Sequence, residues 1–257
     1  MNLIYCFVTQ MNYNFFMKLV DNILNGKKNI VFVDFEGTQY SQEIFAIGAV
    51  KVSLNSKNQI KSSSKPFRAY IKVKGQIGPI IEKITGISEV FLQNNGKNLS
   101  EVLTSFRRYV GNNYSKSIFM CYGNFDKKMI ANTLKNVEAE NDELLIFMLK
   151  NLIDFSSIMS IYIKDNKGQQ LSLKEALKTF NITFEGKEHD PSDDAINLMF
   201  LYNAFLIQKG IVAEEYKKTL NRYSKMPWPI IKLVRELNKN GSVTIEQYNE
   251  FIEEELK

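Results

Sequence analysis

The only histidine of this chain, His189, lies in an acidic segment directly before a long apolar pattern with helical spacing. Histidine is the side chain whose ordinary pKa lies closest to neutral, so it can take a proton from a water molecule. Carboxylates that could share a site with it occur as Asp34, Glu36, Asp126 and Asp194. Such a set could bind two metal ions and deprotonate a water. Without this context, a lone histidine is more often a capping or packing residue.

Asp34 and Glu36 follow a short run of β-branched and aromatic residues at 30–33, which is typical of a central strand covered on both faces. Side chains alternate along a strand, so the two carboxylates would point to the same side, with Phe35 between them. They would lie at the carboxyl end of the strand, where open α/β sheets place ligands. An Asp-X-Glu triplet also occurs by chance in acidic surface turns. The apolar strand favours a site, because carboxylates beside a buried strand need a metal or hydrogen bonds.

Asp126 and Asp194 are both expected near the start of a helix. Asp126 follows the apolar stretch 117–122, which predicts a strand, and a helical pattern begins after it. The simple alternative for Asp126 is a helix N-cap. An aspartate at position 190 followed by a proline predicts the start of the helix that contains Asp194. In its first turn Asp194 would also complement the helix dipole, as Asp190 and Asp193 would.

The other patterns alternate between strands and helices and predict an α/β fold. A polar, serine-rich and basic stretch at 55–65 indicates a hairpin tip or a mobile loop. Further strands are expected at 44–54 and 67–73, and helices at 15–24, 99–110 and 171–181, with three short helices at 213–223, 228–237 and 244–256. We divide the chain into a leading segment (1–27), a main domain (28–209) and a small helical extension (210–257).

The charge distribution indicates an anionic partner. The net charge is +5, and residues 44–81 contain no aspartate or glutamate, although seven of the lysines and arginines lie there. Lys57, Lys61 and Lys65 are therefore expected to hold a phosphate backbone. The alternative is a solvated hairpin in a lysine-rich chain.

Two isolated cysteines, Cys6 and Cys121, have no spacing typical of zinc sites or disulfide frameworks. This use of cysteine indicates a reducing cytoplasm. The N-terminus has no basic leader with a cleavage site, and no apolar run approaches the roughly 18 residues that a membrane span needs. We therefore expect a soluble, cytoplasmic protein.

Five separated motifs resemble the DEDDh class of 3′-to-5′ exonucleases, and within it the branch of enhanced-RNAi exonucleases and sporulation-pathway-inhibitor homologues. That class has Asp-X-Glu on its first strand, an aspartate after the fourth, and a histidine followed five residues later by an aspartate. The motifs are VDFEGT at 33–38, EIFAIGAV at 43–50, ITGIS at 84–88, YGNFD at 122–126, and EGKEH at 185–189 continued by DAIN at 194–197. Gly37 stands where the class has alanine. The stretch between His189 and Asp194 is unusually acidic, which leaves open which acid does what, although spacing favours Asp194.

The resemblance implies a ribonuclease H-like mixed sheet of about five strands flanked by helices. It implies a 3′-to-5′ exonuclease that releases nucleoside 5′-monophosphates from the 3′ ends of RNA or single-stranded nucleic acid. Asp34, Glu36, Asp126 and Asp194 would bind two Mg²⁺ or Mn²⁺ ions, and His189 would be the general base.

The resemblance also implies substrate contacts. Thr38 and its neighbouring backbone, with Gly37 and Phe35, would meet the terminal 3′ hydroxyl. Ile87 would belong to a wall against which the last base stacks, with hydrophobic packing as the alternative. Lys127, beside Asp126, could meet a phosphate, although exposed lysines on helices are usually only solvated.

Other functions stay open at this point. An enzyme with this site could instead degrade very short oligonucleotides or nucleotide signals, or trim DNA in repair. A protein of another class could keep the fold as a catalytically silent module that binds nucleic acid or a partner. The complete set of four acids and a histidine argues against a silent module, because converging carboxylates repel one another unless they bind metal.

Overall fold

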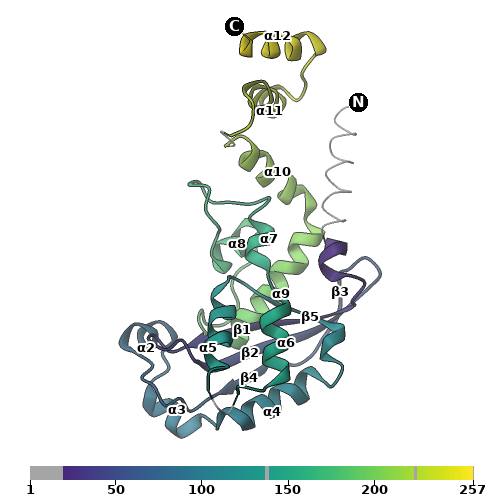
Figure 1. Ribbon diagram of the computed structural model, residues 1–257. Helices are drawn as coiled ribbons and strands as arrows, with labels where there is room; N and C mark the ends of the chain where they lie inside the picture. Colours follow the sequence, from purple (N-terminus) through teal and green to yellow (C-terminus); the bar gives the residue numbers. More distant parts are fainter. Residues whose placement is uncertain (1–19, 137–138, 223–224, 257) are drawn as a thin grey trace. The chain divides into compact units, whose positions relative to one another are not determined.

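The computed structural model describes residues 20–136, 139–222 and 225–256 (Figure 1). The chain divides into two units. The sheet unit comprises Lys27–Met159 and Leu171–Gln208. The helical unit comprises Ser160–Gln170, Lys209–Lys257 and Met1–Gly26, as far as these are described. All the residues considered above for metal binding and catalysis belong to the sheet unit.

A six-stranded mixed sheet forms the centre of the sheet unit. Its strands are β1 (Asn29–Gly37), β2 (Ile44–Leu54), β3 (Ile60–Ser63), β4 (Phe67–Tyr70), β5 (Ser117–Cys121) and β6 (Leu152–Asp154). Strand β1 pairs antiparallel with β2 and parallel with β5, and β6 pairs parallel with β5. Strands β3 and β4 both pair antiparallel with β2. The expected mixed α/β sheet is confirmed, with one strand more than expected.

Two of the strands were missed by the sequence patterns. Strand β3 lies in the serine-rich stretch whose polarity indicated a loop, and only one of its four residues is apolar. Strand β6 has three residues, too few for an alternating pattern. The expected strand at 67–73 ends early, at Tyr70, and continues only as an isolated bridge between Ile71 and Lys97.

The helices of the sheet unit are α2 (Pro79–Thr85), α3 (Glu89–Asn95), α4 (Leu99–Val110), α5 (Phe125–Thr133), α6 (Glu143–Asn151), α7 (Phe155–Met159), α8 (Leu173–Thr179) and α9 (Pro191–Ile207), with a 3₁₀ turn at Tyr114–Lys116. Helices α4, α5, α8 and α9 were predicted from the sequence. Helices α2, α3 and α7 were not, and each has at most seven residues. Helix α6 was also missed.

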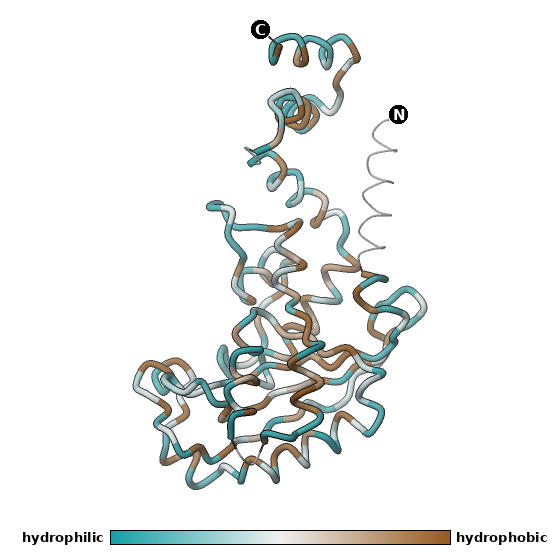
Figure 2. Tube along the Cα trace, in the orientation of Figure 1, coloured by the Kyte–Doolittle hydropathy of each residue, from teal (hydrophilic) through white to brown (hydrophobic). Residues whose placement is uncertain are grey.

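Side chains alternate along β1, so its residues contact different helices on the two faces of the sheet. Residues 30–33 are fully buried. All four are apolar and so belong to the hydrophobic residues coloured brown in Figure 2. Val33 and Phe35 belong to a core that includes residues of α4, α5 and α6. Phe32 points to the other face, where its ring lies 5.5 Å from that of Tyr202 on α9. Asp34 and Glu36 continue the face of Phe32, so both carboxylates point to the α9 side of the sheet.

Helix α9 starts as the sequence predicted and lies directly against β2. The Asp190 carboxylate accepts the backbone N–H groups of Ser192 at 3.1 Å and Asp193 at 3.3 Å, and Pro191 is at the first helical position. A Cβ atom on Gly48 would lie 1.9 Å from the carbonyl carbon of Pro191. Gly48 therefore allows an approach between strand and helix that any side chain would prevent.

We expect Gly48→Ala to lower the free energy of unfolding by about 1–3 kcal/mol, the usual cost of overpacking a closely packed core. The added methyl group meets backbone atoms, which cannot rotate away as a side chain would. Urea denaturation would measure the change. Gly210→Ala is the matched control, because nothing lies within 4 Å of its Cβ position. Equal stabilities of the two variants would contradict the expected steric conflict.

The helical unit contains α10 (Lys209–Leu220), α11 (Trp228–Asn240) and α12 (Ile245–Glu255). The Thr219 hydroxyl donates to the carbonyl of Tyr162 at 2.9 Å, which joins α10 to the segment 160–170. Lys232 on α11 pairs with Glu254 on α12. Three helices were expected here. Of the helix expected at 15–24, residues 20–24 are helical, and 15–19 lie outside the described residues.

Among the residues that the structure describes, no single helix is both long and apolar enough to cross a membrane. The consecutive helices α9 and α10 meet that test of length and composition only when they are taken together as a bent pair.

Candidate metal centre

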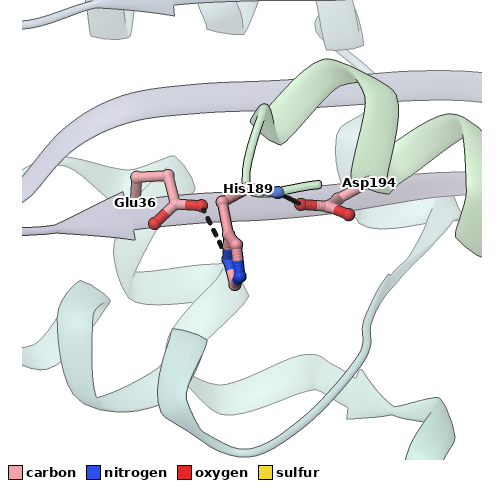
Figure 3. Close-up of side chains that lie close together, drawn as sticks. All are labelled: Glu36, His189 and Asp194. Carbon is pink, nitrogen blue, oxygen red and sulfur yellow. Dashed lines mark hydrogen bonds and ion pairs between the residues drawn. The ribbon is translucent and has the colours of Figure 1, made fainter. Parts of the chain in front are cut away.

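Glu36, His189 and Asp194 lie together at the carboxyl end of β1 (Figure 3). One possible ligand atom from each residue lies within 4.8 Å of those of the other two. The Nδ1 atom of His189 is 3.9 Å from Oε1 of Glu36, and the Asp194 carboxylate accepts the backbone N–H of His189 at 2.9 Å. The His189 side chain is 54% exposed and that of Glu36 only 13%. The histidine therefore lies on the solvent side of a mostly buried carboxylate.

Asp126 joins this site from α5. It is buried in the first turn of the helix, and its Oδ1 accepts the backbone N–H of Phe35 at 3.2 Å. This bond fixes its carboxylate beside the strand segment that carries Asp34 and Glu36. The N-cap of α5 is Asn124, so the capping alternative for Asp126 does not hold.

The pKa values of all four carboxyl groups are raised above their ordinary values. Burial is the largest cause in every case. It raises the pKa of Glu36 to about 8, with the charges of Asp194 and Asp126 adding to the shift. Burial also raises the pKa of Asp126 and of Asp194 to about 7, although backbone N–H groups partly oppose both shifts. The pKa of Asp34 lies well above its usual range, through burial and then the charges of Asp126 and Asp194.

These carboxylates fit a divalent metal centre by the chemistry of their donor atoms. Hard cations such as Mg²⁺ and Mn²⁺ prefer carboxylate oxygens. Buried carboxylates that repel one another are stabilised in their charged form by such a cation.

The metal-free protein should be more stable at about pH 5 than at about pH 8. Because the carboxyl pKa values are raised in the folded state, folding binds protons between the ordinary carboxyl pKa near 4 and the raised value near 8 of Glu36. The stability gained from these protons is complete below this window and is lost as the pH rises through it. Melting temperatures measured in EDTA would show the loss, and Mg²⁺ should reverse it at the upper end.

Glu36→Gln is the control for this prediction, since glutamine cannot titrate and the variant should lose less stability across the same window. A melting temperature in EDTA that rises steadily with pH would contradict the expected sign.

The three aspartates at the start of α9 have different contacts. Asp190 is the N-cap of α9. The Asp193 carboxylate accepts the backbone N–H of Lys187 at 2.9 Å and a bond from Arg68 at 3.3 Å. Of the three aspartates, only Asp194 belongs to the group whose ligand atoms meet. The structure thus places Asp194 at the centre, and Asp190 and Asp193 in contacts that hold the segment in place.

His189 is held in a backbone conformation that is uncommon for a non-glycine residue, with φ of 62°. Two contacts anchor its loop. The Nζ of Lys187 donates to the carbonyl of Thr85 at 2.6 Å. The buried side chain of Asn197 exchanges hydrogen bonds with the backbone of Glu185, at 3.0 Å from its N–H and 2.8 Å from its carbonyl. The position of the imidazole therefore depends on contacts from other parts of the chain.

Phe35, Gly37 and Thr38, which were expected to contact the substrate, are all buried. Thr38 is buried, and its hydroxyl lies 2.6 Å from that of Ser41 and accepts the Glu43 N–H at 3.2 Å. These bonds stabilise the turn after β1, so the hydroxyl is not presented to solvent. Phe35 is also buried, in the core of the opposite face. The side chains of Thr38 and Phe35 therefore stabilise the turn and the core, and a substrate contact from the backbone of this turn stays a prediction.

Gly37 lies against the side chain of Met129. A Cβ atom there would lie 2.5 Å from the sulfur of Met129. The methionine side chain occupies the space that an alanine methyl group would need.

Ile87 and Lys127 were each predicted with an alternative. Ile87 is buried in a small core cluster with Phe45, Ile77 and Leu92, which favours packing over contact with a base. Lys127 is half-exposed on α5, directly after Asp126.

Lys57, Lys61 and Lys65 lie around β3, toward the end of the sheet away from the metal centre. Asp34 pairs with Gly48, whereas β3 pairs with the last residues of β2, from Val52 onward. Four residues of strand separate these positions, about 13 Å at the usual rise. Binding of a phosphate backbone there stays a prediction, and it concerns only substrates of several nucleotides.

Two residues that support the site were missed by sequence reasoning. The Asp154 carboxylate at the end of β6 accepts the N–H of Gly123 at 2.8 Å and the hydroxyl of Ser156 at 2.6 Å, which fixes the turn before Asp126. Arg68 contacts the start of α9. Aspartate followed by two serines indicates a local cap, but no pattern indicates a partner 31 residues away.

Comparison of the sequence with known protein families finds no match, and comparison with characterised proteins finds none. Solved structures do match. Cell-death related nuclease 4 matches with a TM-score of 0.56 and 18% identity, over 72% of this chain and 65% of that protein. The nuclease domain of 3′hExo, a DEDDh family member bound to rAMP, matches with a TM-score of 0.51 and 15% identity, over 73% of this chain and 95% of that domain.

Exonuclease I of E. coli in complex with an oligonucleotide matches with a TM-score of 0.56 and 16% identity. The match covers 76% of this chain but only 44% of that protein, and a match to a full-length 3′-exonuclease covers 62% of it. The chain therefore spans only part of these longer proteins. At these identities the comparison establishes the architecture, and the chain has the ribonuclease H-like fold of these 3′-exonucleases.

Proposed function

We propose that the protein is a metal-dependent 3′-to-5′ exonuclease that releases nucleoside 5′-monophosphates from RNA or other single-stranded nucleic acid. The observation that carries this proposal is the cluster of Glu36, His189 and Asp194 at the carboxyl end of β1, with the charges of Asp34 and Asp126 beside it. The proteins with the same fold support it, since they include an exonuclease bound to an oligonucleotide and one bound to a histone mRNA stem-loop.

Asp34, Glu36, Asp126 and Asp194 would hold two Mg²⁺ or Mn²⁺ ions. When bound, the ions would lower the pKa of a water molecule and stabilise the charge that develops at phosphorus. His189 is suited to take the proton from that water, because its imidazole is exposed beside Glu36 and its backbone is held by Asp194. The carboxylate of Asp126, by contrast, is buried and exchanges protons with solvent less readily.

The test is the release of mononucleotides from 3′-end-labelled RNA, single-stranded DNA and dinucleotides in Mg²⁺, with EDTA as the control. We expect 5′-mononucleotides from the 3′ end and no release in EDTA. Cleavage of dinucleotides alone would favour a role in degrading very short oligonucleotides. Absence of cleavage in both Mg²⁺ and Mn²⁺ on all three substrates would refute the nuclease proposal and favour a binding module.

A further inference from the structure

Arg68 on β4 contacts the start of α9, next to the segment that carries His189 and Asp194. Its guanidinium donates to the hydroxyl of Ser192 from Nε at 2.8 Å and from Nη2 at 2.5 Å. The same Nη2 lies 2.9 Å from the carboxylate of Asp190 and 3.3 Å from that of Asp193. Arg68 thus contacts three polar residues at the start of α9. Asp194 directly follows the last of them, Asp193, in the chain.

The sheet register places this arginine in line with the metal centre. Gly48 on β2 pairs with Asp34 on one side and with Arg68 on the other. Residues paired across neighbouring strands share a face of the sheet. The backbone of Pro191 lies over Gly48. The first turn of α9 therefore lies over Gly48 and is bound by Arg68 on the neighbouring strand.

The start of α9 carries three aspartates, of which only Asp194 lies with Glu36 and His189. The charge of Asp190 reaches the centre, where it contributes to the raised pKa of Glu36 and of Asp194. A carboxylate this close and not otherwise bound would compete as a metal ligand. Arg68 binds both Asp190, which also caps α9, and Asp193, which also accepts the N–H of Lys187. Within the described residues, the side chain of Asp194 accepts only the N–H of His189.

We propose that Arg68 is a positioning residue that decides which acid of this segment reaches the metal ions. By binding Asp190 and Asp193, it keeps both carboxylates out of the centre and leaves Asp194 turned toward Glu36. The inference rests on the proposed function for the reaction that it serves, but the choice of ligand can be measured by metal binding alone. The Arg68 side chain is 44% exposed, and exposed ion pairs contribute little to stability. Its effect should therefore appear in the site and not in folding.

Arg68→Gln tests this directly. We expect turnover on labelled RNA to fall about 100-fold, the scale expected when a catalytic group moves by about 1 Å. The Mn²⁺ dissociation constant, measured by electron paramagnetic resonance, should fall by about threefold or more, because released carboxylates add ligand charge. Loss of a true metal ligand would weaken binding instead. The melting temperature should stay close to that of the wild type.

The triple variant Arg68→Gln, Asp190→Asn, Asp193→Asn distinguishes ligand choice from a purely structural contact. Asparagine keeps the helix cap at position 190 and the acceptor for the Lys187 N–H at position 193, but it is a poorer metal ligand. We expect turnover to recover to within about tenfold of the wild type and the Mn²⁺ dissociation constant to return to its original value. If Arg68 acted only through its hydrogen bonds, removing its partners would restore nothing.

Arg107→Gln is the matched control. Arg107 lies on α4, on the opposite face of the sheet, and its Nη2 is 2.8 Å from Asp142. It should change neither turnover nor Mn²⁺ binding. The inference is overturned if Arg68→Gln behaves like this control, or if the triple variant is as impaired as Arg68→Gln. If the wild type cleaves no nucleic acid, the proposed function fails. The inference about Arg68 is then tested by metal binding alone. It is supported if the Mn²⁺ dissociation constant falls in Arg68→Gln and returns in the triple variant, and it is overturned otherwise.

Discussion

Asp194→Asn should reduce turnover by about 10²–10³-fold or more, the scale on which loss of an electrostatic contact to the transition state acts. Asp194 shares the centre with Glu36, so asparagine removes the charge of a proposed ligand while its side-chain oxygen can still accept the N–H of His189. The metal-free variant should be as stable as the wild type or more stable. The reason is that Asp194 raises the pKa of both Asp34 and Glu36, so its charge opposes theirs.

Asp193→Asn is the control for this result, because it changes the adjacent acid in the same helical turn. Its carboxylate faces Lys187 and Arg68, and asparagine can still accept the Lys187 N–H. We expect its turnover to stay within about tenfold of the wild type, as for residues outside the site. Steady-state rates at saturating Mg²⁺ and isothermal titration with Mg²⁺ would compare the two variants. Equal losses of metal affinity would mean that Asp194 is not the ligand that its position indicates.

His189→Asn should reduce turnover by about 10²–10⁴-fold, the range that general-base assistance contributes. Asparagine is chosen because it tolerates the positive φ of 62° at this position better than alanine does. The backbone N–H that Asp194 accepts is unchanged in the variant. The loss should therefore be confined to the chemical step, with Mg²⁺ affinity within about threefold of the wild type, as expected when no ligand is removed.

Single-turnover rates would separate the chemical step from substrate binding in this variant. Asp190→Asn serves as the control within the same loop, because asparagine is as good an N-cap as aspartate. A variant at position 189 that keeps more than a tenth of the wild-type rate would show that another group accepts the proton.

Local sequence patterns were sufficient for the parts of the site that depend on neighbouring residues. The alternation of side chains put Asp34 and Glu36 on one face of β1, and the structure has them on the α9 side. Aspartate and proline at 190 and 191 predicted the start of α9, and the helix begins there. These patterns are reliable because periodicity and capping are set within a few residues of the chain.

The tertiary structure alone decided which groups meet. Asp126 finds its partner in the N–H of Phe35, 91 residues earlier in the chain. The division of labour among Asp190, Asp193 and Asp194 depends on Arg68, more than 120 residues away from them. Thr38 and Ile87, expected at the substrate, are buried because a turn and a small core enclose them. Burial and partner choice depend on packing between distant segments, which residue types and local spacing do not contain.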